Sequence, residues 1–91
     1  MERLYLFNLN ISGGPLDPSN TDLQMASRIT EAHPDVLFSR YEGQEWIRYS
    51  RHSTSLQAAT LTAMRELHSF LPHAQLLGVV ERAPSSEAFF A

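Results

Sequence analysis

The stretch that decides the fold is residues 35–51, DVLFSRYEGQEWIRYSR, in which two apolar and aromatic runs flank Glu42-Gly43. A two-residue connection between strand-forming runs is typical of a tight β-hairpin. With this turn, the predicted pairs are Tyr41–Gln44, Arg40–Glu45, Ser39–Trp46, Phe38–Ile47, Leu37–Arg48 and Val36–Tyr49. Because side chains alternate between the faces of a strand, the register assigns each residue to one side of a sheet.

The register separates a core face from a second, less apolar face. The core face carries Val36, Phe38, Ile47 and Tyr49. At its rim the charged residues Arg40 and Glu45 stand opposite each other, and we expect them to pair. The second face carries Leu37, Tyr41, Trp46 and Arg48.

The rest of the chain predicts two helices and two more strands. Residues 3–11 are aliphatic and aromatic and indicate a first strand, and residues 75–81 indicate a last one. Between the first strand and the hairpin, glycine, proline and Asx residues at 12–20 indicate a loop.

Both expected helices begin with capping-box spacing and run towards a proline. Thr21 is followed by Gln24, and Thr54 by Gln57, at the three-residue interval of that motif. The first helix is expected to bury Leu23, Ala26 and Ile29 or Thr30. The second has an apolar stripe at helical spacing, formed by Leu56, Ala59, Ala63, Leu67 and Phe70.

The order β-α-β-β-α-β predicts an α+β fold, a ferredoxin-like sandwich of a four-stranded antiparallel sheet with two helices on one face. At 91 residues the chain has room for one domain. We place that domain at residues 1–82 and a C-terminal tail at 83–91.

The composition argues against several classes of function. There is no cysteine, so thiolate chemistry and cysteine zinc sites are excluded. The net charge of −3 argues against nonspecific binding to nucleic acid. No secretory signal or membrane span is recognisable in the sequence, and we expect a cytoplasmic protein that does not engage a membrane.

The sheet has more large apolar side chains than one layer of helices can cover. On the first strand Leu4 and Leu6 point one way, while the side chains at 5, 7, 9 and 11 point the other. Exposed apolar patches usually mark interaction surfaces. We therefore expect a homo-oligomer, such as a homodimer, or a protein partner on a sheet face formed by Leu4, Leu6, Leu37, Tyr41, Trp46 and Arg48. Alternatively Phe89 and Phe90 of the tail cover this face, or the register is shifted by one.

Residues 4–9, Leu-Tyr-Leu-Phe-Asn-Leu, resemble the first ribonucleoprotein signature of RNA-recognition motifs. That resemblance implies a single-stranded RNA-binding domain in which Tyr5 and Trp46 stack on bases and Arg48 touches phosphate. The second signature is incomplete, because Gln44 stands where a stacking aromatic residue is expected. RNA binding is therefore the alternative function.

A looser similarity covers residues 4–82. Tyr5-x-Phe7-x-Leu9, Ser55-Leu56-x-x-Ala59 and the closing Val79–Arg82 are similar to small, uncharacterised bacterial proteins of ferredoxin-like fold. Some longer relatives carry a helix-turn-helix, which we do not expect in the nine residues after Arg82. The resemblance implies a dimeric regulatory protein.

No catalytic constellation is recognisable. Residues 12–20 contain neither the arginine that acylphosphatases need nor a P-loop lysine. The histidines, His33, His52, His68 and His73, show no metal-ligand pattern. We expect no catalytic residue, metal or cofactor, and interpret the chain as a noncatalytic interaction or regulatory module. A small dimeric ligand-binding protein or enzyme of the same fold is the third alternative.

Overall fold

The structure is a computed structural model that describes residues 2–82. Its elements are β1 (Arg3–Ser12), α1 (Met25–Ala32), β2 (Leu37–Tyr41), β3 (Gln44–Ser53), α2 (Leu56–Phe70) and β4 (Gln75–Glu81). The α+β class and the expected β-α-β-β-α-β order are confirmed. The tail at 83–91, including Phe89 and Phe90, lies outside the described residues.

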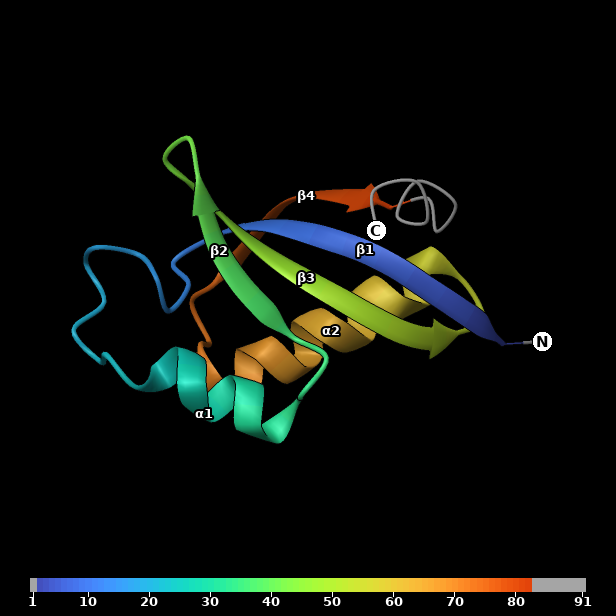
Figure 1. The fold of residues 1–91 in the computed structure, drawn as a ribbon, viewed down its shortest axis with the longest axis horizontal. Helices are drawn as coiled ribbons and strands as arrows, with labels where there is room; N and C mark the ends of the chain where they lie inside the picture. The colour runs from blue at the N-terminus through green and yellow to red at the C-terminus, as the bar shows by residue number, and fades with distance from the viewer. Residues whose placement is uncertain (1, 83–91) are drawn as a thin grey trace, which may run out of the picture.

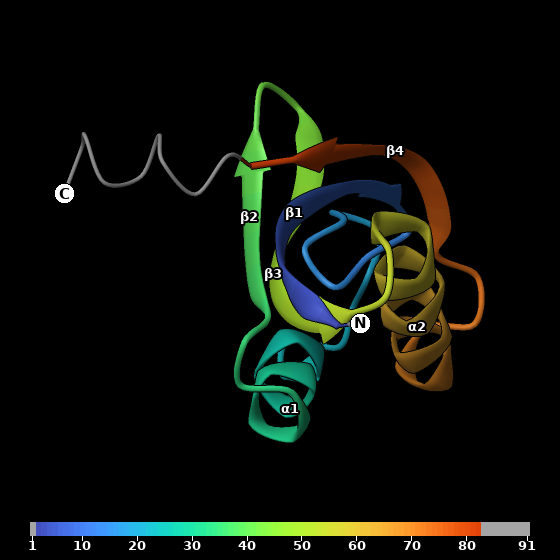
Figure 2. The ribbon, with the colours of Figure 1, turned by 90° about the vertical axis from the view of Figure 1, so that its right-hand side faces the viewer.

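The four strands form one sheet in the order β2-β3-β1-β4, and every pair of neighbours is antiparallel. The longest strands, β1 and β3, therefore lie in the centre, and β2 and β4 form the two edges. Both helices lie on the same side of the curved sheet (Figures 1 and 2). The other side of the sheet is not covered by either helix.

The β2–β3 hairpin has the register that the sequence predicts, from Tyr41–Gln44 to Leu37–Arg48. Both turn residues have positive φ, 52° at Glu42 and 78° at Gly43, as a type I′ turn requires. The pair Val36–Tyr49 falls outside the ladder, because β2 begins one residue later. Both side chains are nevertheless buried, as expected for the core face.

The core lies between the helices and the inward face of the sheet. On β1 the inward residues are Tyr5, Phe7, Leu9 and Ile11, all buried. They pack with Ile47 and Tyr49 of β3, with Ile29 of α1, and with Ala59, Ala63 and Leu67 of α2. The rings of Phe7 and Tyr49 stack with centroids 5.2 Å apart. Leu4 and Leu6, on the opposite parity of β1, therefore point away from the helices.

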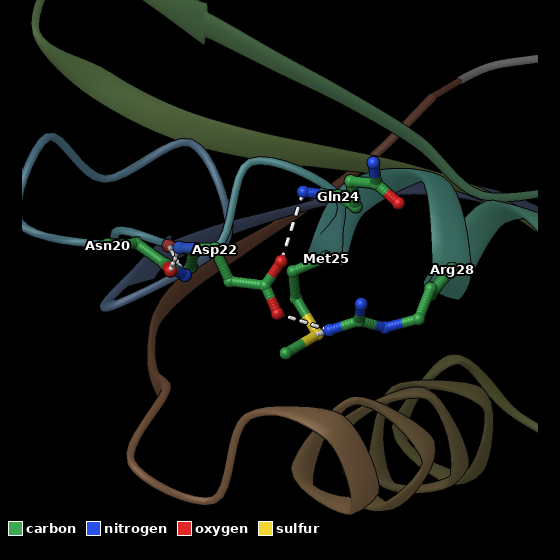
Figure 3. Close-up of polar contacts among 6 residues, drawn as sticks. Asn20, Asp22, Gln24, Met25 and Arg28 are labelled. Atoms are coloured by element: carbon green, nitrogen blue, oxygen red, sulfur yellow. Dashed lines mark hydrogen bonds and ion pairs between the residues drawn. The ribbon is translucent and has the colours of Figure 1, made fainter.

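The predicted cap of the first helix is wrong, because local Asx turns compete with it. The helix begins at Met25, and Asp22 rather than Thr21 accepts the hydrogen bond from the main-chain N–H of Gln24 (3.1 Å) and binds Arg28 (Figure 3). Asn20 accepts in the same way from the N–H of Asp22 (2.9 Å). Such two-residue turns are typical of Asn and Asp. They leave Leu23, expected on the apolar stripe, 92% exposed.

The N-cap of the second helix lies one residue after the predicted one. Ser55, not Thr54, is the N-cap, and its side chain accepts from the N–H of Ala58 at 3.0 Å. The apolar stripe is otherwise as expected, with Ala59, Ala63 and Leu67 buried. Within residues 2–82, neither helix is long and apolar enough to cross a bilayer.

Candidate functional site

The candidate site is the outer face of the sheet, the side opposite the helices. The strand registers and the alternation of side chains define its residues: Leu4, Leu6, Asn8, Asn10, Ser12, Leu37, Ser39, Tyr41, Gln44, Trp46, Arg48, Ser50, His52, Gln75, Gly78 and Val80. The structure places all six residues of the expected interface on this face: Leu4, Leu6, Leu37, Tyr41, Trp46 and Arg48.

Several apolar side chains of the outer face are open to solvent. Leu4 is 46% exposed, Leu37 56%, Tyr41 67% and Val80 51%. Trp46 is half-buried between them. These residues come from all four strands, and polar side chains such as Asn8, Ser39 and Ser50 lie among them.

A hollow lies near the middle of the outer face. It consists of two adjoining depressions of about 220 and 300 Å³, and both are lined by Asn8, Ser39 and Trp46. Among residues 2–82 the side-chain oxygen of Asn8 is buried and has no hydrogen-bond partner. Asn8 was not among the residues predicted for this face, although its side chain points to the same side of β1 as those of Leu4 and Leu6. The hollow thus combines an indole, a hydroxyl and an amide acceptor.

Charge is almost absent from the outer face. The chain has seven arginines and ten acidic residues, but among the outer-face residues defined above only Arg48 carries a formal charge. A sheet face adapted to water usually carries many charged side chains, whereas the centres of protein interfaces are depleted of them. Among the residues defined above, the outer face is therefore poor in charge and carries mainly uncharged polar and apolar side chains.

Tyr5 and Trp46, the expected RNA-stacking pair, do not share a face. Tyr5 is 8% exposed and lies in the core beneath the sheet, with the guanidinium of Arg3 4.5 Å from the centre of its ring. Trp46 is opposite Asn10 on the outer face. Because the sheet separates the two rings, they cannot stack neighbouring bases of one strand. Trp46 and Arg48, in contrast, line the same hollow.

Arg40 faces Glu45 across the hairpin, as predicted, but among residues 2–82 the expected ion pair between their side chains is not formed. Arg40 donates to the carbonyls of Gly43 (3.1 Å) and Leu16 (3.4 Å). Glu45 is 3% exposed, and its carboxylate accepts from the main-chain N–H of Leu16 at 2.9 Å. Burial raises the pKa of Glu45, although the nearby Arg40 lowers it in part. The carboxylate holds the loop that follows β1 under the sheet.

Arg51 belongs to a partly buried charge cluster. Its Nε lies 2.6 Å from Asp35 and its Nη1 lies 2.7 Å from Glu66 of α2. The same Glu66 oxygen lies 3.3 Å from Nδ1 of His33. The cluster connects the end of α1, β3 and α2, and we interpret it as structural.

The four histidines do not converge. His33 belongs to the charge cluster, and His68 contacts the carbonyl of Ala74 (2.8 Å). His52 and His73 are exposed at separate places on the surface. Across the described part of the chain, no group of three or more His, Asp or Glu residues could hold a metal ion.

Comparison with models of protein families, with curated proteins and with solved structures found no match. The outer face is therefore interpreted from its geometry and chemistry.

Proposed function

We propose that the chain is a noncatalytic interaction module that associates through its outer face, with a second copy as the first occupant. We also propose that its arrangement is ferredoxin-like, with a regulatory role of the kind that the bacterial resemblance implies. In support of the fold, β1 and β2 are separated by one strand in the sheet, as are β3 and β4. Each β-α-β unit thus leaves room for a strand of the other unit, as in split β-α-β folds.

The observation that supports the function is a set of exposed apolar side chains, with little charge around them, on the uncovered side of the sheet. Full burial of a large apolar side chain contributes about 1.5–3 kcal/mol. Leu4, Leu37, Tyr41 and Val80 are each about half exposed, so that together they offer about 3–6 kcal/mol per copy. Two copies offer about twice this amount, which is comparable with the association cost of about 4–15 kcal/mol. These four residues by themselves therefore only offset the association cost. Self-association in the micromolar range needs a net free energy of about −8 kcal/mol, which the remaining contacts of the outer face, such as those of Leu6 and Trp46, would have to supply.

Sedimentation velocity of the full chain from about 1 to 100 µM tests this proposal. We expect Val80→Ser, on the outer face, to shift the association to at least tenfold higher concentration. The matched control is Leu61→Ser on α2, since Leu61 is a similarly exposed apolar residue, at 59%, on the far side of the molecule. A wild-type chain that stays monomeric at 100 µM would overturn self-association through this face.

Single-stranded RNA is the second candidate, favoured by the shared position of Trp46 and Arg48 in one hollow. Fluorescence of Trp46 titrated with an oligouridine at low salt distinguishes the two functions. The interaction module predicts no quenching by RNA and a loss of association through the outer face in Trp46→Ala. Quenching that disappears at high salt, in a chain that sediments as a monomer, would favour RNA binding.

A further inference from the structure

Within the described part of the chain, the edge strand β2 has main-chain groups with no hydrogen-bond partner. A type I′ turn joins Tyr41 to Gln44 by a hydrogen-bonded pair, and bonded pairs then alternate along an antiparallel ladder. Ser39 and Leu37 are therefore bonded to β3, whereas the N–H and C=O groups of Phe38 and Arg40 point away from the sheet. Among residues 2–82, none of the main-chain hydrogen bonds outside the ladders uses these four groups.

The two edges of the sheet differ in regularity. The pairing of β4 with β1 shifts register between Asn10 and Ile11, so that Leu77 is an extra residue. Such bulges twist an edge and hinder its pairing with another strand. β2 has no shift over Leu37–Tyr41. Of the two edges, β2 is therefore the one that can accept a further strand.

A groove beside β2 adds an apolar contact surface. It has a volume of about 460 Å³ and lies between α1 and the start of β2. Its apolar lining comes from Leu16, Ala26, Leu37 and Phe38. In Figure 2 the helix α1 lies below β2 rather than beside it. A strand added to this edge would cover the groove as well.

We propose that β2 of a second copy is this added strand, paired antiparallel about a two-fold axis at Ser39. The axis pairs Phe38 of each copy with Arg40 of the other, so that all four free groups on each copy find partners in four hydrogen bonds. Leu37 lies beside Tyr41 of the second copy on the outer face, and aliphatic–aromatic pairs of this kind stabilise sheets. The Phe38 ring lies beside an arginine on the inward face, which favours a cation–π contact.

This contact goes beyond the proposed function, because it joins edges rather than faces. Its two-fold axis is perpendicular to the sheet, whereas a two-fold axis that packs two outer faces together lies in the plane of the sheet. Where these two perpendicular axes intersect, the two contacts together close a tetramer, and our proposal includes that intersection. The edge contact also joins two outer faces into one continuous surface.

Amide hydrogen exchange of the wild-type full chain, measured by NMR at low and high protein concentration, tests the edge contact directly. We expect the amides of Phe38 and Arg40 to become at least tenfold more protected at high concentration. Ser39, which already bonds to β3, should change little. Phe38 and Arg40 amides that exchange equally fast at every concentration would overturn the proposal.

A pair of variants then distinguishes the contact through the β2 edge from the contact through the outer face. Arg40→Pro removes both the arginine side chain and the main-chain N–H that points to the second copy. Arg40→Ala removes the same side chain but keeps this N–H. We expect wild type and Arg40→Ala to sediment as tetramers and Arg40→Pro as a dimer held by the outer faces. Val80→Ser should instead leave a dimer held by β2. If Arg40→Pro and Arg40→Ala sediment alike, the edge contact is wrong, whatever Val80→Ser shows for the outer face.

Discussion

The carboxylate of Glu45 accepts a hydrogen bond from the main-chain N–H of Leu16, at 2.9 Å, beneath one end of the sheet. Glu45 is a β3 residue, and Leu16 belongs to the loop between β1 and α1. The contact therefore fixes a segment that crosses the open end of the core. It does so at the cost of burying a carboxylate.

The buried carboxylate predicts how stability depends on pH. Because burial raises the pKa of Glu45 above its ordinary value of 4.5, the folded state binds the proton more tightly than the unfolded state. The stabilising contribution is complete below pH 4.5 and is lost as the pH rises through the raised pKa. Urea unfolding of wild type and Glu45→Gln between pH 4 and 7 measures this effect.

The glutamine keeps an acceptor for the Leu16 N–H and cannot ionise. We expect the stability of wild type relative to Glu45→Gln to fall steadily across that range. The comparison cancels the contributions of other carboxylates, such as Asp17 and Asp22, whose pKa values are lowered by hydrogen bonds to Ser19 and Arg28. A pH-independent difference would show that burial of Glu45 has no titration consequence.

Gly14 is required where the loop passes Glu45. A Cβ at Gly14 would lie 2.5 Å from Oε1 of Glu45 and 2.6 Å from Cδ1 of Ile11. We expect Gly14→Ala to lower the free energy of unfolding by about 1–3 kcal/mol, as overpacking does. Gly78→Ala is the control, because a Cβ there meets nothing within 4 Å. Equal unfolding midpoints for the two variants would contradict the close approach.

The charge cluster predicts a different cost for two arginines. Arg51 is 17% exposed and lies against Asp35 and Glu66, whereas Arg28, 49% exposed, pairs with Asp22 at the surface. Arg51→Ala leaves partly buried carboxylates without a partner, and we expect a loss of about 1–3 kcal/mol. Arg28→Ala should cost less than about 1 kcal/mol. Urea unfolding at pH 7 checks the order, and a larger loss for Arg28→Ala would contradict it.

The start of α2 distinguishes two neighbouring hydroxyls. We expect Ser55→Ala to destabilise the protein by about 1 kcal/mol, since Ser55 caps the helix through the N–H of Ala58. Thr54 is exposed, and Thr54→Ala should change stability by no more than about 0.5 kcal/mol. Thermal unfolding followed by circular dichroism measures both. Similar losses in both variants would restore Thr54 as a cap.

The sequence predicted best where local rules act alone. Glu42-Gly43 fixes a two-residue turn, and a two-residue turn leaves one possible register, so the partners of Leu37 and Trp46 followed without further information. It predicted worst where local signals compete. The spacing of Thr21 and Gln24 predicts a cap, but Asx turns at Asn20 and Asp22 delay the helix, whose N-cap position is Gln24, and these turns depend on how the whole loop is folded.

By itself the sequence determined the order of the elements, the hairpin register and the excess of apolar side chains on the sheet. The tertiary structure decided that Tyr5 faces the helices while Leu4 does not, because both parities of β1 are apolar and only the packing of α1 and α2 selects one. It also decided the burial of Glu45 and Arg51. Such burial depends on which distant segments, here the Leu16 loop and α2, close over a strand, and no local pattern encodes that.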